Sequence, residues 1–375
     1  MKSLVLAEKP SVARDIARVL GCHKNISGAI EGSNYIVTWA LGHLVTLADP
    51  EEYDKKFKAW DMSYLPMVPK KWELVVIKQT SKQYHNVKTQ LFRKDVSEII
   101  IATDAGREGE LVARWILDKS GCHKPIRRLW ISSVTDKAIK EGFAHLKDGR
   151  AYNDLYHAAR SRAEADWLVG INATRALTCK YNAQLSCGRV QTPTLAMIAH
   201  REQQIRSFKP EDYYGLRCTT SVTGGSVGTM ASIVTWTWQQ KKSGSLRSFN
   251  KDLITGLDKK LKNQTLTVTD VHTSSKRTPS PGLYDLTELQ RDANKRFGFS
   301  AKETLNIMQS LYEHHKVLTY PRTDSRYIGT DIVPTIKERL KSCNIGPYKK
   351  YIPELLKKPL KTSKAFVDDK KVSDH

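Results

Sequence analysis

EIIIATDAGREGELVARWILDKSG, residues 98–121, contains a short apolar run, then a polar turn, then a helical pattern. Residues 98–103 are rich in isoleucine, which is typical of a buried strand. The apolar residues that follow recur at helical spacing, at Leu111, Val112, Trp115 and Ile116. Gly121 comes after the last turn, where glycine commonly ends a helix. A buried strand that leads directly into a helix indicates an α/β fold with a parallel sheet.

Three more segments of the first 150 residues fit the same fold. Residues 3–7, SLVLA, form a short apolar run, and Ser11 follows as the candidate N-cap of a helix. RRLWIS at 127–132 and WELVVIK at 72–78 are two further strand candidates. We therefore predict that residues 1–150 form an α/β domain with a largely parallel sheet.

The sequence pattern changes twice after residue 150. Residues 151–208 have a helical pattern. Residues 209–275 alternate polar and apolar residues, which favours antiparallel strands over 213–222, 231–240 and 266–273. After a linker rich in serine and proline, helical patterns resume within 276–375. The expected architecture is therefore multidomain, with α/β, helical and antiparallel β segments followed by a last, mainly helical one.

The charge of the chain is its strongest bulk feature. There are 61 Lys and Arg against 39 Asp and Glu, so the formal net charge is +22 over 375 residues. Such an excess repels itself unless a polyanion neutralises it, which favours nucleic acid as a partner. An anionic membrane surface is the second candidate, but the sequence has no basic amphipathic helix, signal peptide or transmembrane stretch. We therefore expect a cytoplasmic protein with no membrane partner.

The cysteines do not indicate a structural metal. None of the six forms a CxxC pair or another zinc-like spacing; they are Cys22, Cys122, Cys179, Cys187, Cys218 and Cys343. In a large chain that lacks secretory character they are best interpreted as reduced thiols.

Carboxylates follow two of the predicted strands. Glu8 comes directly after residues 3–7, and Asp104 comes after the strand at 98–103. The carboxyl ends of parallel strands meet at the edge where such sheets bind ligands. Together with Glu108, these side chains could hold Mg²⁺, which prefers carboxylates and water. The alternative is that Glu108 and Glu110 only complement the dipole of the helix in its first turn.

Two segments that contain arginine could bind phosphate. In SCGRVQTP, residues 186–193, Arg189 precedes a predicted helix, whose first N–H groups suit an anion. The alternative is an ordinary helix start capped by Thr192. In AARSRAEADWLVG, residues 158–170, Arg162 could contact a DNA backbone or pair with Asp166 four residues later.

The stretch VLTYPRTDSRYI, residues 317–328, places Tyr320 next to two arginines, two hydroxyls and a carboxylate. By itself this pattern is typical of a strand that ends in a turn. The rest of the chain decides whether this simple interpretation holds.

Taken together, these motifs resemble one protein family. EKPSVA and DAGREGE resemble the Toprim domain shared by topoisomerases and bacterial primases. RAEADWLVGIN, LSCGRVQTP, GFSAKETLNIMQSLYE and LTYPRTDSRYI follow in the order typical of type IA DNA topoisomerases and are most similar to bacterial topoisomerase III. The resemblance covers nearly the whole chain. It implies a toroidal enzyme with a Toprim domain (1–150), a helical DNA-binding segment (151–208), a β-rich arch segment (209–275) and an active-site tyrosine domain (276–375).

The resemblance also implies a chemistry. Tyr320 would attack a phosphodiester of single-stranded DNA and become joined to the 5′-phosphate. Arg322 would stabilise the charge on the phosphate, Lys9 would donate to the same phosphate, and Glu8 would handle a proton or a metal. Mg²⁺ would be held by Glu8, Asp104 and Glu108. Resealing exchanges one phosphoester for another, so ATP is not needed, and the chain has no GxxxxGK[ST] motif.

Further expectations follow from the same resemblance. The substrates would be single-stranded segments of supercoiled or catenated DNA, with strand passage, relaxation of negative supercoils and decatenation. The enzyme would work in the bacterial cytoplasm, associated with the nucleoid or a plasmid, with a helicase or a single-strand-binding protein as a possible partner. The residues expected to contact DNA are His43, Trp60, Arg162, Asp166, Ser186, Cys187, Gly188, Arg189, Val190, Gln191 and Arg322.

The sequence departs from the family pattern in two places. The acidic motif is usually Asp-x-Asp-x-Glu, but Gly106 replaces the middle carboxylate, so we expect one metal ion rather than two. His375 matches an assisting histidine of a Ser-Asp-His-His-Ala-Ile motif that continues in relatives, so we expect a fragment of a longer chain, with the tyrosine domain incomplete at its C-terminus. Two alternatives remain, a Toprim primase or nuclease and a non-catalytic single-strand DNA-binding fragment.

Overall fold

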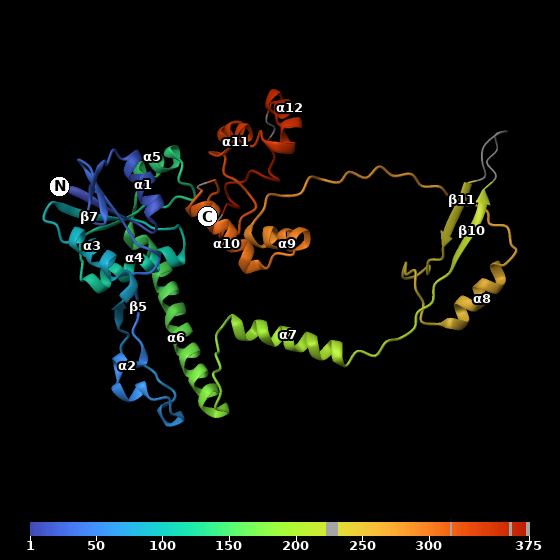
Figure 1. Ribbon diagram of the computed structural model, residues 1–375, viewed down its shortest axis with the longest axis horizontal. Coiled ribbons are helices and arrows are strands. Elements are labelled where there is room, and N and C mark those ends of the chain that lie inside the picture. The colour runs from blue at the N-terminus through green and yellow to red at the C-terminus, as the bar shows by residue number, and fades with distance from the viewer. Residues whose placement is uncertain (223–231, 316, 360–361, 373–375) are drawn as a thin grey trace. The chain divides into compact units, whose positions relative to one another are not determined.

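Strand β1 (Lys2–Ala7) lies at the centre of a seven-stranded sheet in the computed structural model (Figure 1). The strand order is β2-β3-β4-β1-β7-β8-β9, and the pairs β4–β1, β1–β7 and β7–β8 are parallel. The outer pairs are antiparallel. The other strands of this sheet are β2 (Lys24–Ile26), β3 (Ala29–Glu31), β4 (Tyr35–Trp39), β7 (Val96–Ala102), β8 (Ile126–Arg128) and β9 (Lys147–Asp148). The predicted α/β fold with a largely parallel sheet is confirmed.

The structure describes residues 1–222, 232–315, 317–359 and 362–372. His375, a predicted site residue, lies outside these ranges. The chain divides into two units, the first comprising Met1–Arg189 with Ser280–His375 and the second Val190–Pro279. Each unit is described by itself below.

Hydrophobic clusters cover both faces of the large sheet, because every second residue of each central strand points to the same side. In β1, Leu4 and Leu6 belong to one cluster, and Val5 and Ala7 belong to the other. The first cluster packs against α3 (Ser81–Leu91), α4 (Arg107–Ser120) and α6 (Asn153–Tyr181). The second packs against α1 (Pro10–Val19) and α5 (Asp136–Ala144). The parallel strands are thus buried on both faces, as their continuous apolar runs predict.

Two local predictions in residues 1–150 differ in detail from the structure. Helix α1 begins at Pro10 with Lys9 as its N-cap, so Ser11 lies inside the helix, because proline fits the first helical position. The strand predicted at 72–78 is β6 (Leu74–Val76), which pairs with β5 (Val45–Leu47) in a separate antiparallel sheet and not with the large one.

A lobe that follows β5 is attached to the middle of α6. It contains α2 (Pro50–Tyr53) and short 3₁₀ turns. Asn172 accepts a hydrogen bond from the Met67 backbone N–H at 2.6 Å and donates one to the Met67 carbonyl at 2.9 Å. Trp167 Nε1 donates to the Ala48 carbonyl at 2.9 Å. These bonds fix the lobe to the long helix.

None of the helices that the structure describes is long and apolar enough to cross a membrane.

The C-terminal part of the first unit is helical and is bound to the α/β domain by side chains. Its helices are α9 (Leu286–Phe297), α10 (Ala301–Glu313), α11 (Ile336–Ser342) and α12 (Ile352–Lys357). Asp331 Oδ2 accepts hydrogen bonds from Ser133 Oγ at 2.6 Å and Thr135 Oγ1 at 2.9 Å. The hydroxyls of Ser11 and Tyr312 lie 3.0 Å apart. Segments that are about 200 to 300 residues apart in the sequence therefore meet.

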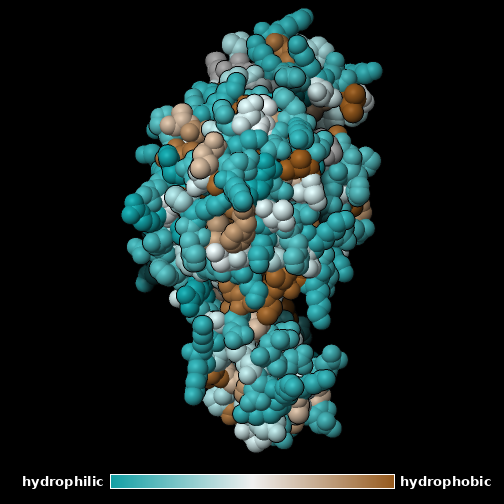
Figure 2. All heavy atoms as spheres, turned by 90° about the vertical axis from the view of Figure 1, so that its left-hand side faces the viewer, coloured by the Kyte–Doolittle hydropathy of each residue, from teal (hydrophilic) through white to brown (hydrophobic). Residues whose placement is uncertain are grey.

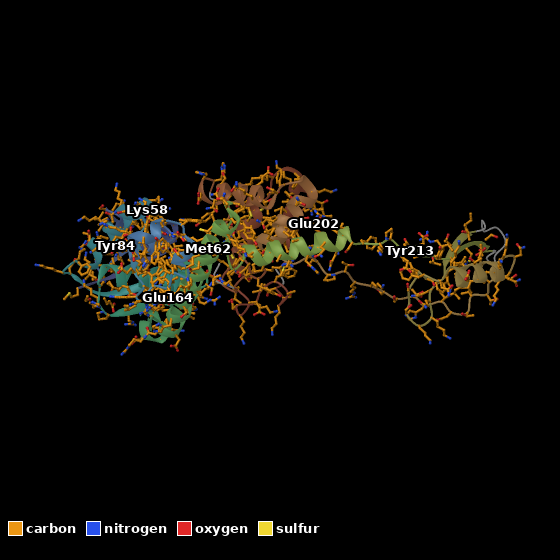
Figure 3. The ribbon with its side chains drawn as sticks, turned by 90° about the horizontal axis from the view of Figure 1, so that it is seen from below. Lys58, Met62, Tyr84, Glu164, Glu202 and Tyr213 are labelled. Atoms are coloured by element: carbon orange, nitrogen blue, oxygen red, sulfur yellow. The ribbon has the colours of Figure 1, made fainter. Side chains whose placement is uncertain are left out.

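The second unit contains α7 (Gln191–Arg206), the antiparallel pair β10 (Arg217–Val222) and β11 (Ser232–Thr237), and α8 (Lys251–Leu261). No residue of α7 is buried, and side chains such as Glu202 project outward along it (Figure 3). The strands predicted at 213–222 and 231–240 match β10 and β11, although both are shorter. The strand predicted at 266–273 is wrong: those residues form no helix or strand and belong to none of the sheets of the described residues.

Candidate active site

Three charged side chains meet where β1 and β7 end. The register pairs Ala7 with Ala102, so Glu8 and Asp104 emerge at the same edge of the sheet. The Asp104 backbone N–H donates to Glu8 Oε2 at 3.2 Å. Lys9 Nζ donates to Asp104 Oδ2 at 2.7 Å and lies 3.9 Å from Glu8 Oε1. Each of the three side chains is less than one fifth exposed. The meeting of Glu8 and Asp104 at this edge agrees with the prediction from the sequence.

Burial and neighbouring charges shift the pKa values of two of these groups. Burial, reinforced by the negative charge of Asp104, raises the pKa of Glu8 to about 7, although the ammonium of Lys9 acts in the opposite direction. Burial alone would lower the pKa of Lys9, but the hydrogen bond to Asp104 and the charges of Asp104 and Glu8 outweigh it, so this pKa is raised. At neutral pH the cluster thus combines a persistent cation with a carboxyl that can exchange a proton.

Tyr320 lies directly against this cluster. Lys9 Nζ is 3.9 Å from the centroid of the Tyr320 ring, within the range of a cation–π contact. The ring of Tyr312 packs edge-on against Tyr320, with centroids 5.7 Å apart and an interplanar angle of 81°. Because the Tyr312 hydroxyl reaches Ser11 in α1, the phenol of Tyr320 is held between the α/β domain and the end of α10. The structure therefore brings together Tyr320, Lys9, Glu8 and Asp104.

The residues after Tyr320 are held by hydrogen bonds to Leu283 and Leu286 and not by a strand. The described residues 317–327 contain no helix or strand, so the simple interpretation of this stretch as a strand is wrong. The Thr323 carbonyl accepts from the Leu286 N–H at 2.9 Å, and Arg326 Nε donates to the Leu283 carbonyl at 2.9 Å. Arg322 is exposed, and its guanidinium makes no hydrogen bond or ion pair with any described residue. It is thus available to an anion.

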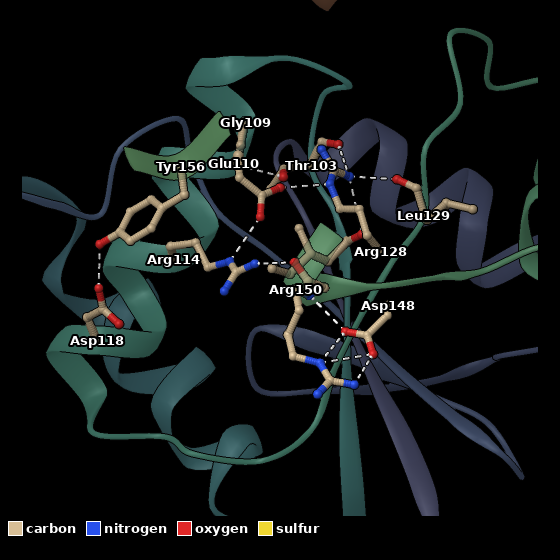
Figure 4. Close-up of polar contacts among 12 residues, drawn as sticks. Thr103, Gly109, Glu110, Arg114, Asp118, Arg128, Leu129, Asp148, Arg150 and Tyr156 are labelled. Atoms are coloured by element: carbon tan, nitrogen blue, oxygen red, sulfur yellow. Dashed lines mark hydrogen bonds and ion pairs between the residues drawn. The ribbon is translucent and has the colours of Figure 1, made fainter. Parts of the chain in front are cut away.

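A buried ion pair supports the loop that carries Asp104, and the sequence analysis missed it (Figure 4). Arg128 and Glu110 are both fully buried, and Arg128 Nε donates to Glu110 Oε2 at 2.9 Å. The same guanidinium donates to the carbonyls of Thr103 at 2.9 Å and Asp104 at 2.7 Å. Arg114 Nε donates to the second oxygen of Glu110 at 2.9 Å. Arg128 therefore fixes the backbone of Thr103 and Asp104, directly after β7.

Gly109 is another residue that the sequence did not indicate as important for the site. A Cβ at this position would lie 2.2 Å from the Asp104 carbonyl oxygen and 2.9 Å from the Asp104 nitrogen. Thr103 Oγ1 also donates to the Gly109 carbonyl at 2.7 Å. The first turn of α4 can therefore approach the loop after β7 this closely only because residue 109 has no side chain.

Glu108 does not join Glu8 and Asp104 in this structure. Its carboxylate is more than half exposed and lies 3.2 Å from Arg162 Nη1. Arg162 Nε is in turn 4.0 Å from Asp166 Oδ2, and Arg189 Nε donates to Asp166 Oδ1 at 2.5 Å. Among the residues that the structure describes, no three His, Cys, Asp or Glu side chains are grouped so that they could hold a metal ion. In this arrangement, the ammonium of Lys9 lies against the carboxylates of Glu8 and Asp104.

The remaining predicted DNA-contacting residues lie in several parts of the chain. The Cys187 N–H donates to Thr174 Oγ1 at 2.9 Å, which fixes the turn before residues 188 and 189 to the helix. Residues Val190 and Gln191 belong to the second unit. Trp60 is 52% exposed, and the guanidinium of Arg175 stacks over its ring at 5.0 Å. His43 is exposed, and its ring lies 6.3 Å from that of Trp115.

Known proteins match the chain along its whole length. Residues 150–375 match a family described as DNA topoisomerase, and residues 3–134 match the Toprim domain. The chain is 63% identical to a DNA topoisomerase 3 of Bacillus cereus and 60% identical to that of Bacillus subtilis, each over 374 residues. These alignments cover 100% of this chain and 50% of each relative. The chain thus spans half the length of the curated relatives that it matches.

A solved structure has the same fold. Full-length topoisomerase I from Thermotoga maritima aligns with a TM-score of 0.57, covering 93% of this chain and 52% of that one. The two sequences are 22% identical, so this similarity concerns the fold alone.

Proposed function

This chain belongs to the DNA topoisomerase family and includes a Toprim domain, and on that premise we propose that it is the cleaving and rejoining part of a type IA enzyme. The enzyme would cut one DNA strand through a 5′-phosphotyrosine, pass a strand through the gap and reseal it without ATP. The observation that carries this proposal is the contact of Tyr320 with Lys9, which is itself paired with Asp104 beside Glu8.

In the proposed cleavage step, Tyr320 Oη forms a bond to the phosphorus of a phosphodiester. The bond from that phosphorus to the 3′ oxygen breaks, the phenol gives up its proton, and the 3′ oxygen takes one. Glu8 is suited to donate or accept such a proton, because burial and Asp104 raise its pKa to about 7. Lys9, which lies over the Tyr320 ring, and the exposed Arg322 would neutralise the charge on the phosphate. Resealing is the reverse of these steps.

The single strand would reach this site along α6. Arg189, Arg162 and Asp166 form one chain of ion pairs there, and an incoming phosphate can exchange places with Asp166 on either arginine. Trp60, with its exposed ring backed by Arg175, is suited to stacking on a base. The other proposed contacts are His43, Ser186, Cys187, Gly188, Val190 and Gln191. The +22 charge supports binding to a polyanion.

A bound Mg²⁺ would help to hold the free 3′ end and the phosphate for resealing. We propose that one ion binds at Glu8 and Asp104, with Glu108 as a third ligand. In this structure these carboxylates have Lys9 and Arg162 as partners, so the partners would have to change on metal binding. Gly106 stands where the family usually has another carboxylate, which favours one ion over two.

Several features of the whole protein are part of the same proposal. We propose relaxation of negative supercoils and decatenation as its reactions, in the cytoplasm near the nucleoid or a plasmid, with a helicase or a single-strand-binding protein as partner. The proposed domain organisation is a Toprim domain (1–150), a helical DNA-binding segment (151–208), a β-rich arch segment (209–275) and an active-site tyrosine domain (276–375).

The test is to trap the covalent intermediate. The whole protein is mixed with an end-labelled single strand, denatured, and examined for label that migrates with the protein. We expect an adduct from the unmodified protein and none from Tyr320→Phe, which should still bind the strand with a steep salt dependence. Tyr312→Phe is the matched control, because it removes the neighbouring phenol hydroxyl but keeps the ring that packs against Tyr320, and it should still form the adduct. A labelled adduct with Tyr320→Phe would refute the assignment.

A further inference from the structure

Residues 332–359 form a small lobe that follows the segment containing Tyr320. We name these residues the basic lobe. Its two ends are held together: the Ile328 N–H donates to the Phe366 carbonyl at 3.0 Å, and the Thr330 N–H donates to Asp369 Oδ1 at 2.8 Å. Asp331, next to the first end, is bonded to Ser133 and Thr135 of the α/β domain. The lobe, which includes α11 and α12, is thus fixed at its base.

One side of the lobe carries an exposed apolar stripe. It consists of four residues at successive helical turns, Ile345, Tyr348, Tyr351 and Leu355. The backbone defines the spacing, because each of the last three donates to the carbonyl of the one before it, at 3.1, 2.9 and 3.1 Å. The four residues are 66%, 61%, 57% and 46% exposed. They therefore lie in one row on the surface.

The stripe lies in strongly basic surroundings. Residues 332–359 contain seven basic side chains and two acidic ones, so the lobe carries a net charge of +5. Lys349 and Lys350 lie between the two tyrosines in sequence, and Lys350 Nζ is 5.7 Å from the centroid of the Tyr351 ring. One of the two acidic residues, Glu354, is paired with Lys358 at 2.7 Å. The charge near the tyrosines is thus predominantly positive.

Figure 2 shows a mostly hydrophilic face on which hydrophobic side chains occur in small groups. Exposed tyrosines next to lysines are the combination that single-strand-binding proteins use, since any base can stack on an aromatic ring while lysines contact the backbone phosphates. The same positive charge would repel the identical lobe of a second copy.

We propose that the basic lobe binds single-stranded nucleic acid, with bases stacked on Tyr348 and Tyr351 and phosphates at Lys349 and Lys350. This inference rests on the proposed function, because the strand bound by the lobe is a further part of the strand that Tyr320 cuts, or a second strand held for passage. The lobe thereby extends the DNA-binding surface beyond the residues along α6.

The test measures binding of the whole protein, with Tyr320→Phe as background, to labelled oligothymidylates of about 8 and about 30 nucleotides, lengths around and well above the site size of one binding module. The double variant Tyr348→Ala/Tyr351→Ala should weaken binding of the longer strand by about tenfold or more, since stacking of each base on a ring contributes a substantial factor to affinity. Tyr348→Phe/Tyr351→Phe keeps the rings and should bind as the parent does. Lys349→Ala/Lys350→Ala should lower the slope of log K against log salt by about 0.7 for each phosphate that the lysines no longer neutralise.

Phe92→Ala is the matched control. Phe92 is 51% exposed at the end of α3 and is followed by Arg93 and Lys94, so it is also an exposed aromatic residue near basic side chains. It should leave binding of both oligonucleotides unchanged. An equal weakening with Phe92→Ala would show that any exposed aromatic residue matters and would overturn the assignment to the lobe.

Two other results would also overturn the proposal. One is unchanged binding of the longer strand by the double alanine variant, which is expected if another part of the whole protein covers the stripe. The other is a loss of self-association in sedimentation without weaker binding of the strand, which would make a second copy the occupant. The same variants with Tyr320 intact should still form the covalent adduct on the short strand. Absence of the adduct from every variant and from the parent would refute the proposed function instead, independently of what the lobe binds.

Discussion

Replacement of Gly109 by alanine tests whether the close approach of α4 to the loop after β7 positions Asp104. The added Cβ would lie 2.2 Å from the Asp104 carbonyl oxygen, 0.8 Å inside the 3.0 Å that such contacts require. That carbonyl cannot easily retreat, because Arg128 Nη2 holds it at 2.7 Å. The loop must therefore move by most of an ångström, or α4 must move away from it.

Gly109→Ala should lower both the stability of the protein and its rate of DNA cleavage. Overpacking at a well-packed position destabilises a protein by about 1–3 kcal/mol, which thermal or urea unfolding would detect. A shift of about 1 Å in a catalytic group can lower a rate by about 100-fold, so the rate of covalent adduct formation on a labelled single strand should fall by about that factor. The rate is measured at a temperature where the variant is still folded, so that the two effects are separated.

Gly256→Ala is the matched control. Gly256 also lies within a helix, α8, but a Cβ there would meet nothing within 4 Å. Alanine should be tolerated at this position or stabilise it by up to about 1 kcal/mol, with no change in cleavage. If Gly109→Ala cleaves at the unmodified rate with unchanged stability, the loop is not held as described and its geometry does not control Asp104.

Three other expectations follow from the structure. Arg128→Met should lower the free energy of unfolding by about 3 kcal/mol, because it leaves Glu110 buried with one partner fewer. Adding Glu110→Leu to this variant should recover most of the lost stability. Urea titration measures both variants, and losses that add up instead would contradict the pairing of Arg128 with Glu110. The hydrogen bonds from Arg93 lower the pKa of Asp95 to about 2, so this carboxylate stabilises the fold above the unfolded pKa of about 3.9 and the stabilisation disappears as the pH falls toward 2. Arg93→Gln should therefore make the urea midpoint less dependent on pH between about 5 and 3, and an identical dependence would exclude this pair. Calorimetric titration should detect one Mg²⁺ per chain, bound more tightly in Gly106→Asp because a carboxylate is added; two tightly bound ions in the unmodified chain would contradict the one-ion proposal.

The sheet and part of the site were predictable from sequence because they depend on local patterns. Continuous apolar runs at 3–7 and 98–103 predict strands buried on both faces, and parallel pairing then places Glu8 and Asp104 at one edge. The proximity of Tyr320 to Lys9 did not follow from any local pattern. It was expected only because the motifs resemble those of a family.

Other features depend on tertiary contacts that leave no clear trace in the sequence. The sequence predicts a strand over RRLWIS at 127–132, but the strand is β8 (Ile126–Arg128), and alternation along it turns Arg128 inward to the carbonyls of the loop. No local signal in the sequence identifies it, because β8 (Ile126–Arg128) has three residues and two of them are arginines. The alternation at 266–273 predicted a strand, but alternation describes one face of a strand and does not provide the neighbour with which it must pair.

The most direct test of the account is to identify the residue that carries the DNA. The whole protein is allowed to react with a short single strand, the trapped adduct is digested with protease and nuclease, and the remaining nucleotide is located by mass spectrometry. We predict a single modified peptide in which a 5′-phosphate is joined to Tyr320. A nucleotide on Tyr312, whose ring lies 5.7 Å away, or a linkage through a 3′-phosphate, would contradict it.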